Sequence, residues 1–481
     1  METSIISATY TWAQFIPEFT LVGLASLILL ADCFLPKLPK SFYALLGAVG
    51  TFGAAFFIDN TAAFSQFRML ALIATGLTLL LAYDYRKIAA TSISGSDSEE
   101  GTSELYALPL IACAGIGALT QAKDIIMLFV CLEVITLSSY VMAGYFRRNQ
   151  GSIEAGVKYL ILGAMSTGLL VFGAAWYYGT TGTFLLAPEV VFGVFYQAGS
   201  PYIIGFMLAT ALLLAGAFFK TGTAPMHIWI PDVYQGAPTP VSAFLAVASK
   251  TAGFAVLCIL LAPFIAVTET TISLPEVLLV LTALTLLIGN LGAIVQTNAK
   301  RLLGYSSIAQ AGFIMVFLVN DYAAQAQVAN YLTAYLLATM AAFYAIAMVR
   351  TQRGSEELFA FRALGKTNPC LAFLITVAFA SLAGVPLTYG FIVKFDSFRA
   401  LVDLSTAGQM NCWCISLLIV MIIGAAAGFY YYFKVIREMY WEKPHTEDTP
   451  LVVPMMTAGV MAACAILLII YGTWPLLTGN L

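Results

Sequence analysis

Five ionisable side chains lie inside stretches of this sequence that are otherwise continuously apolar. Glu133, Lys158, Lys220, Lys250 and Lys394 occupy segments such as IIMLFVCLEVITLSSYV and VSAFLAVASKTAGFAVLCILL. A charged side chain at the centre of a membrane helix costs about 2.5–3.5 kcal/mol even on lenient insertion scales. Because five such groups in one membrane domain need a reason, the sequence predicts a path for ions or protons.

The composition places the chain in a membrane. It is 60% hydrophobic and 10% charged, with a mean hydropathy of +0.89, whereas soluble domains are about one-quarter charged. The formal charge of -3 gives no electrostatic case for a nucleic-acid partner. The cysteines have no metal-ligand spacing, and no basic region precedes the first apolar stretch, so we expect a retained helix there rather than a cleaved signal.

A window of about 20 residues finds fourteen candidate membrane helices, which predicts an all-α polytopic membrane protein. An even number of spans returns both termini to one side. The predicted spans are 14–34, 41–58, 66–84, 105–121, 124–146, 155–178, 202–223, 239–264, 275–296, 302–319, 325–349, 370–395, 411–435 and 451–475.

The basic residues indicate the orientation, because cytoplasmic loops are enriched in Lys and Arg. With the termini on the periplasmic side, the inner loops hold most of the 22 Lys and Arg residues, among them Lys300 and Arg301. The outer side then holds only Arg68, Lys123 and Arg399. The polar stretch at 91–104 is expected to be a flexible cytoplasmic loop. No segment outside the membrane is long enough for a nucleotide fold, and no GxxxxGK[ST] phosphate loop is present, so we expect no ATP use.

Two segments share a pattern that interrupts a helix. AFFKTGTAPMH at 217–227 and AFASLAGVPLT at 378–388 each combine small residues with a proline, Pro225 or Pro386. Proline removes a backbone donor, and apolar surroundings tolerate this only where protein or cavity water satisfies the freed carbonyl. A simple proline kink would explain the pattern. We favour discontinuous helices in two halves of an inverted repeat, which mark transport sites, because an ionisable residue lies near each proline.

The buried positions have alternative explanations. Glu133 lies about ten residues, or ~15 Å, into its helix, where it is either a protonated structural glutamate or, as we favour, paired with a lysine. Lys250 is similarly deep and needs a carboxylate or water. Lys158 is about two turns inside its helix and could instead reach the inner surface. His227 follows the first interruption and could carry a proton or brace the loop. Asp232 is expected to hold the following turn.

A carboxylate near a lysine favours the charged ammonium, whereas desolvation disfavours it. A glutamate–lysine couple can therefore hold or release a proton as the distance between the two groups changes. On this basis Glu133 with Lys220 is a plausible gate, and Lys250 a relay station.

The run from Lys220 to Lys250, KTGTAPMHIWIPDVYQGAPTPVSAFLAVASK, resembles the antiporter-like membrane subunits of respiratory complex I and of multisubunit cation/proton antiporters. Within that group, PDVYQGAPTPVSAFL is similar to the subunit N family of proton-pumping NADH:quinone oxidoreductases. The flanking motifs LEVITLSSYVMAGY, VKYLILGAMSTGLLVFG, RLLGYSSIAQAGF and LAGVPLTYGFIVKF agree. The resemblance covers nearly the whole chain.

The resemblance implies a fold of about 14 transmembrane helices with two inverted five-helix repeats and two discontinuous helices. The parts would be 1–104 (three helices and a cytoplasmic loop), 105–265 and 266–437 (the two repeats) and 438–481 (a C-terminal helix). By matching motifs, Glu133 and Lys220 would form the coupling pair, Lys158 and Lys250 the central relay, His227 an inter-repeat link and Lys394 the exit. The chain departs from the family at VPLTYGF, which puts Tyr389 near the second interruption.

The resemblance also implies partners and location. No cofactor is expected in this chain, and NADH, FMN, iron–sulfur clusters and quinone are expected in other subunits. The partners would be other complex I membrane subunits and lipid, in a bacterial inner membrane. Two further readings remain open: a subunit of a multisubunit Na+/H+ antiporter, or a structural spacer with vestigial charges.

Overall fold

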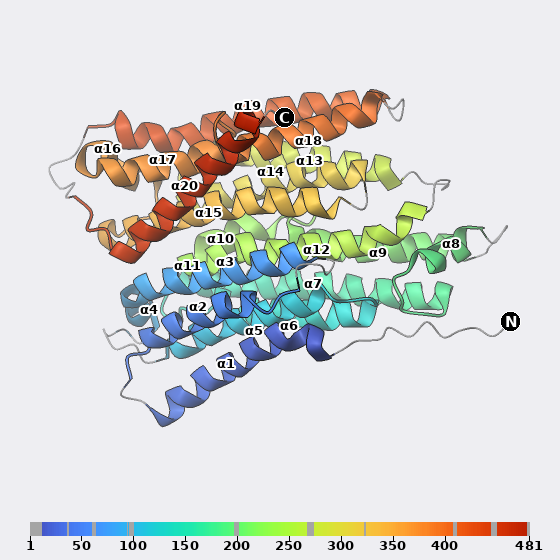
Figure 1. Ribbon diagram of the computed structural model, residues 1–481, viewed down its shortest axis with the longest axis horizontal. Helices are drawn as coiled ribbons and strands as arrows, with labels where there is room; N and C mark the ends of the chain where they lie inside the picture. The colour runs from blue at the N-terminus through green and yellow to red at the C-terminus, as the bar shows by residue number, and fades with distance from the viewer. Residues whose placement is uncertain are drawn as a thin grey trace.

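The computed structural model describes residues 12–35, 38–59, 64–93, 95, 101–196, 202–266, 274–321, 324–406, 411–443 and 450–478. The regular elements of these residues are helices, which lie side by side along the long axis of the molecule, with α20 crossing several of the others obliquely (Figure 1). The all-α prediction is therefore confirmed. The predicted loop at 91–104 is described only in part, because 94 and 96–100 lie outside the described residues.

Eleven helices of the described residues are long and apolar enough to cross a bilayer. One of them is built from α11 (Thr239–Phe244), a π-helical turn (Leu245–Ser249) and α12 (Lys250–Leu261). The other ten are α1 (Ile16–Phe34), α3 (Ser65–Asp84), α6 (Ile125–Ala143), α7 (Gln150–Thr181), α9 (Ile203–Thr221), α13 (Leu274–Ile294), α14 (Ala299–Asn320), α15 (Gln325–Arg353), α19 (Asn411–Tyr440) and α20 (Met455–Thr478).

Shorter helices complete the structure. Three of the predicted spans correspond to apolar helices of 15–17 residues, namely α2 (Ser41–Ala55), α5 (Ser103–Leu119) and α17 (Pro369–Ala383). The remaining α-helices are α4 (Arg86–Ile93), α8 (Pro188–Tyr196), α10 (Trp229–Gly236), α16 (Leu364–Thr367) and α18 (Tyr389–Thr406). Short 3-10 turns lie at Trp12–Phe15, Ala262–Ala266 and Leu358–Phe361.

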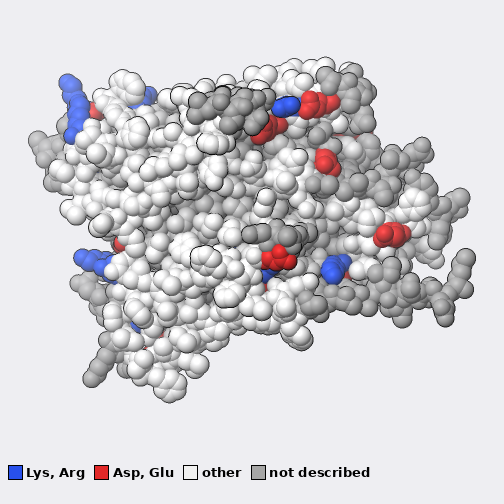
Figure 2. All heavy atoms as spheres, in the orientation of Figure 1, with Lys and Arg blue, Asp and Glu red and all other residues white. Residues whose placement is uncertain are grey.

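The helices divide into a buried centre and exposed flanks. In their apolar windows, the helix formed by α11 and α12 is 100% buried and α14 and α15 are each 94% buried, whereas α1, α7 and α19 are only 28% buried. The exposed residues on the flanking helices are largely apolar, and most of the face drawn in Figure 2 is uncharged, with patches of Lys and Arg at one end and scattered acidic and basic patches toward the other. The centre therefore provides a low-dielectric site for polar groups, and the flanks suit contact with lipid or neighbouring membrane proteins.

Both predicted interruptions are present. α9 ends at Thr221 and α17 at Ala383, and each is followed by a glycine with left-handed backbone, Gly222 (φ 75°) and Gly384 (φ 87°). A left-handed glycine followed within a few residues by proline is a typical helix C-terminus. The predicted end at 395 was wrong, because α18 continues to Thr406; its charged side chains lower the hydropathy without ending the helix.

The second interruption is held by close backbone packing. Gly390, in the first turn of α18, donates from its backbone N–H to Ser381 Oγ at 3.2 Å, and an added Cβ would lie 1.9 Å from the Ser381 carbonyl oxygen. Backbone cannot move aside as a flexible side chain can.

We therefore expect Gly390→Ala to destabilise the protein by about 1–3 kcal/mol or more, which would lower the melting temperature of the detergent-purified protein and its amount in membranes. Gly459→Ala on α20 is the matched control, because an added Cβ there has no heavy atom within 4 Å. Equal melting temperatures for the two variants would contradict the prediction.

Candidate functional site

Lys220 lies at the C-terminal end of α9 and is 5% exposed. Its ammonium donates to Thr136 Oγ1 on α6 at 2.8 Å and lies 5.9 Å from the centre of the Tyr159 ring. Glu133 is one turn earlier on α6, half-buried, and accepts a hydrogen bond from Thr167 Oγ1 at 2.8 Å. Within the described residues the carboxylate interacts with Lys220 only at longer range. Thr136, rather than Glu133, is the direct partner.

Lys250 is the first residue of α12 and is 2% exposed. Its ammonium donates to the carbonyl oxygen of Ser307 on α14 and lies 5.2 Å from the Tyr335 ring. The preceding turn, Leu245–Ser249, is a π-helix, a rare geometry that occurs frequently at functional sites. The structure therefore places Lys250 in the buried centre with neutral oxygen and aromatic partners.

Lys394 packs against the second interruption. It lies on α18, is 6% exposed, and donates to the carbonyl oxygens of Leu382 at 2.6 Å and Ala383 at 3.0 Å. These carbonyls belong to the last turn of α17, where the helix has no further N–H groups to offer and carries partial negative charge. The interruption of α17 thus creates the binding site for the ammonium, which also lies 5.2 Å from the Phe313 ring.

Lys158 has a different environment. Its side chain is 42% exposed and forms ion pairs with Glu154 at 2.7 Å and with Asp232 at 2.8 Å. Asp232, which lies within α10, also accepts from Arg301 on α14 at 2.7 Å, so it joins three helices. The exposed side chain of Lys158 agrees with the alternative that it reaches the surface rather than the buried centre.

His227 lies between α9 and α10 and is half-buried. Its backbone carbonyl accepts from the Ile230 N–H at 3.0 Å, while its Nδ1 is buried without a hydrogen-bond partner among the described residues. The same segment is tied to α13, because the Ala224 N–H donates to Thr285 Oγ1 at 2.9 Å. Among the described residues, no hydrogen bond joins His227 to Lys220, Lys250 or Lys394.

Polar side chains of α14 and α19 form a chain of contacts from Ser306, the neighbour in sequence of the Ser307 that binds Lys250, to the site of Lys394, and the sequence analysis did not single them out. Ser306, next to Ser307, shares a short hydrogen bond with Tyr432, and Tyr432 accepts from Gln310 Nε2 at 3.2 Å. Gln310 Nε2 also donates to the Leu382 carbonyl at 3.1 Å, the oxygen that Lys394 binds. The polar residues of the motif SSIAQ, which stand in an otherwise apolar helix, could have indicated this chain of contacts.

Between Lys220 and Lys250 the hydrogen-bond network is incomplete. The hydroxyls of Tyr140, Tyr159 and Ser249 are buried and make no hydrogen bond within the described residues. The Tyr140 and Tyr159 rings meet edge-on at 4.8 Å, and Tyr159 stacks on Trp229 at 4.5 Å. Buried hydroxyls are normally satisfied by protein or internal water, so this aromatic cluster is a place where water would complete a connection.

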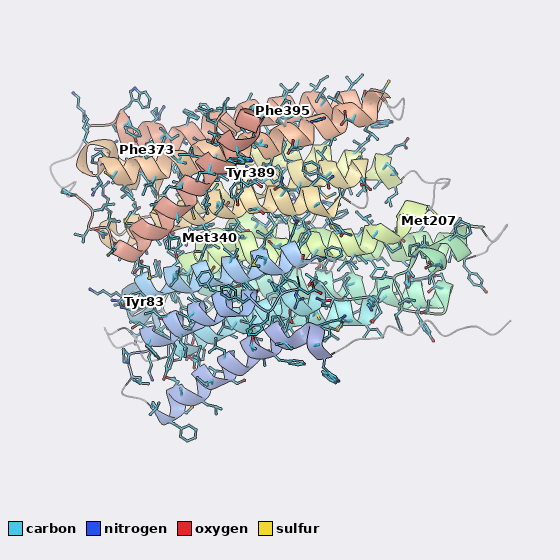
Figure 3. All side chains as sticks on the ribbon, viewed as in Figure 1. Tyr83, Met207, Met340, Phe373, Tyr389 and Phe395 are labelled. Carbon is cyan, nitrogen blue, oxygen red and sulfur yellow. The ribbon has the colours of Figure 1, made fainter. Side chains whose placement is uncertain are left out.

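Tyr389, the departure from the family motif, joins three helices. It is 7% exposed at the start of α18, its hydroxyl donates to Asn330 Oδ1 on α15, and its ring stacks on Tyr471 of α20 at 5.2 Å. Figure 3 places it where α20 crosses the bundle. Tyr389 therefore braces the interrupted helix that carries Lys394.

Among the basic residues expected on the inner face, Lys300 differs most clearly in its burial. Expected in a loop, its side chain is 3% exposed and lies 3.1 Å from Glu356. It borders a pocket of about 410 Å³ that is also lined by Lys158, Asp232 and Arg301. No group of three or more His, Cys, Asp or Glu residues in the described part of the chain could hold a metal ion.

Buried lysines beside interrupted helices define a class: antiporter-like membrane proteins. The family described as NADH:quinone oxidoreductase/Mrp antiporter, TM, matches residues 122–423. The fold is similar to a chain of respiratory complex I from Thermus thermophilus with bound aureothin (TM-score 0.76, 28% identity, 96% of this chain and 97% of that chain). A chain of the Mrp complex from Dietzia shares the fold at 19% identity (TM-score 0.74, 97% and 96% covered).

Curated relatives narrow the assignment. NADH-quinone oxidoreductase subunit N of Brevibacillus brevis is 35% identical, with 97% of this chain and 94% of the relative covered. Subunit N 1 of Opitutus terrae is 34% identical, with 97% of both covered. The chain belongs to the NADH-quinone oxidoreductase subunit N family, which confirms the resemblance found in the sequence.

Proposed function

We propose that this chain is the proton-translocating membrane subunit N of a bacterial NADH:quinone oxidoreductase, and that it moves H+ outward in response to quinone reduction elsewhere in the complex. The observation that carries the mechanism is the set of three lysines buried in the centre of the bundle. Lys220, Lys250 and Lys394 each bind neutral oxygens, so each ammonium can lose its proton without leaving an unpaired carboxylate beside it.

The roles follow the chain of contacts. Glu133 acts on Lys220 at longer range and would tune its proton affinity, Lys250 would relay, and Lys394 would release the proton outward. Lys158 with Asp232 would supply protons at the inner end, and His227 would link the two repeats. The polar contacts from Ser306 to Gln310 support transfer from Lys250 to Lys394.

The architecture that supports this mechanism has fourteen crossings. Eleven long helices and three shorter apolar helices provide them, with two inverted five-helix repeats at 105–265 and 266–437, a three-helix segment at 1–104 and a C-terminal helix at 438–481. The excess of Lys and Arg in the predicted inner loops supports periplasmic termini. NADH, FMN, iron–sulfur clusters and quinone would bind other subunits, and the partners would be the neighbouring membrane subunits and lipid.

Purification from native membranes in mild detergent tests the assembly. We expect subunits carrying iron–sulfur clusters and flavin to co-purify with this chain. Co-purification with only other antiporter-like membrane chains would favour the alternative, a Na+/H+ antiporter subunit, whose fold is shared.

Lys220→Ala tests the mechanism. We expect NADH-driven acidification to fall by about tenfold or more, because a positioned proton-transfer group is removed. Thr210→Val on the same helix is the control, since within the described residues the Thr210 hydroxyl bonds its own helix alone, donating to the Phe206 carbonyl at 3.0 Å. Unchanged pumping in Lys220→Ala would favour a structural spacer.

A further inference from the structure

Lys300 is a buried cation that the path described above leaves unused. It is the second residue of α14, and its ammonium donates to the Ala237 carbonyl oxygen at 2.8 Å. Ala237 caps the C-terminal end of α10, the helix that follows the first interruption. Lys300 therefore binds the end of α10 as Lys394 binds the end of α17.

A carboxylate accompanies Lys300. Glu356 Oε1 lies 3.1 Å from the ammonium, accepts from Thr239 Oγ1 at 3.3 Å and lies 3.9 Å from Arg350 Nε. Because Lys300 and Glu356 both line the 410 Å³ pocket, a charged pair that is otherwise buried borders a space formed by α7, α10, α14 and α15. The pocket is also lined by Ile88 and Ser92 of α4, which lies at one end of the bundle (Figure 1).

Residues on the same face of α14 lie between Lys300 and Lys250. Ser307 follows Lys300 by seven residues on the same face of α14, a rise of about 10 Å, and its carbonyl binds the Lys250 ammonium. Its hydroxyl is 3.5 Å from the Tyr234 hydroxyl of α10. At Gly304, between the two, an added Cβ would lie 3.2 Å from Pro231 Cα, so α10 and α14 pack backbone to backbone along this stretch.

We propose that Lys300 is a further proton-carrying residue, which takes protons from the pocket and passes them to Lys250. This rests on the proposed function. The Nζ–H bond of the Lys300 ammonium breaks and its proton enters the hydroxyls of Tyr234 and Ser307 with intervening solvent water. A proton from the far end of that chain forms a new Nζ–H bond on the neutral amine of Lys250. The Lys300 amine then regains a proton from hydronium in the pocket, so charge and protons balance.

Replacing Lys300 by arginine distinguishes a proton-carrying role from a role in capping α10. At position 300 it keeps the positive charge and the hydrogen-bond donors, but it does not deprotonate in proteins. A residue that only caps α10 tolerates arginine, whereas a carrier does not. Lys434 on α19 is a matched control, because it also donates to a backbone carbonyl, that of Gln296 at 2.9 Å, and is not among the residues that line the pocket.

The test compares Lys300→Arg, Lys434→Arg and Lys250→Met in the assembled oxidoreductase, using inside-out membrane vesicles energised with NADH. We expect Lys300→Arg to assemble and to lower the ratio of protons moved to NADH oxidised several-fold, with Lys434→Arg at the wild-type ratio. If Lys300→Arg keeps the wild-type ratio while Lys250→Met loses pumping, the proposed role of Lys300 is overturned and the proposed function is not. Wild-type ratios in both would overturn the proposed mechanism as well.

Glu356→Gln provides a second measurement, should arginine not fit at position 300. The amide keeps the size of the side chain but loses the charge that holds the Lys300 proton, so proton movement should decline at a pH lower by about one unit than in wild type. A pH profile that coincides with wild type would overturn the proposal. The charged and titratable groups that line the pocket around this pair, which stay unchanged in the variant, are Tyr85, Glu154, Lys158, Asp232, Arg301 and Arg350.

Discussion

Lys250→Met is expected to lower NADH-driven proton translocation by about tenfold or more while the chain remains folded. Methionine is similar in length, and a buried ammonium replaced by an apolar group removes a desolvation penalty rather than adding one. The Ser307 carbonyl that Lys250 binds lies in the interior of α14, where the backbone offers it a partner. What is lost is the only group at this position that can take up and release a proton.

The measurement is acidification of inside-out vesicles by the assembled complex, with the amount of complex determined on native gels. We expect a decrease of about tenfold or more. Thr251→Val is the control: Thr251 is next in sequence and fully buried, and in the part of the chain that the structure describes its hydroxyl bonds the Val247 carbonyl alone, at 2.9 Å. Pumping by Lys250→Met at the level of the control would exclude Lys250 from the path.

Arg68→Met is expected to destabilise the protein by about 3–5 kcal/mol, because it leaves a carboxylate buried without its partner. Arg68 on α3 is 4% exposed and Glu18 on α1 is 6% exposed. The guanidinium donates to both oxygens of Glu18, at 2.7 and 2.9 Å through Nη2, and to the Gln14 carbonyl at 3.0 Å. This pair ties the exposed α1 to the rest of the bundle.

Thermal unfolding of the detergent-purified protein measures the effect. The double variant Glu18→Met with Arg68→Met should regain much of the lost stability, since apolar replacements of a buried ion pair are often neutral or stabilising. A single variant as stable as wild type would show that the pair contributes nothing, and a double variant no better than the single would show that the loss comes from packing.

The membrane spans could be predicted from the sequence more completely than the contacts of the site. Most predicted spans agree with the helices to within a few residues, because crossing a membrane requires a long apolar run that can be read locally. The two interruptions were also predictable, since proline and glycine act on the backbone of their own segment. Deeply placed lysines such as Lys220, Lys250 and Lys394 stand out for the same reason: apolar neighbours in sequence imply apolar surroundings.

Their partners were not predictable. Ser306, Gln310 and Tyr432 become a connection only when α14 and α19 pack together near α17, which no local pattern specifies. Glu133 was predicted to form a couple with Lys220; the register of α6 against α9 places Thr136 against the ammonium, with Glu133 acting at longer range.

The amino-acid sequence by itself determined the family, the helical class, the positions of the interruptions and the lysines that must be buried, because each depends on residues close together along the chain. Only the tertiary structure decided that Lys300 is covered and Lys158 is open to a pocket. Both lie near helix ends, where hydropathy alone does not distinguish solvent from a neighbouring helix, and burial there depends on which distant segments pack over the side chain.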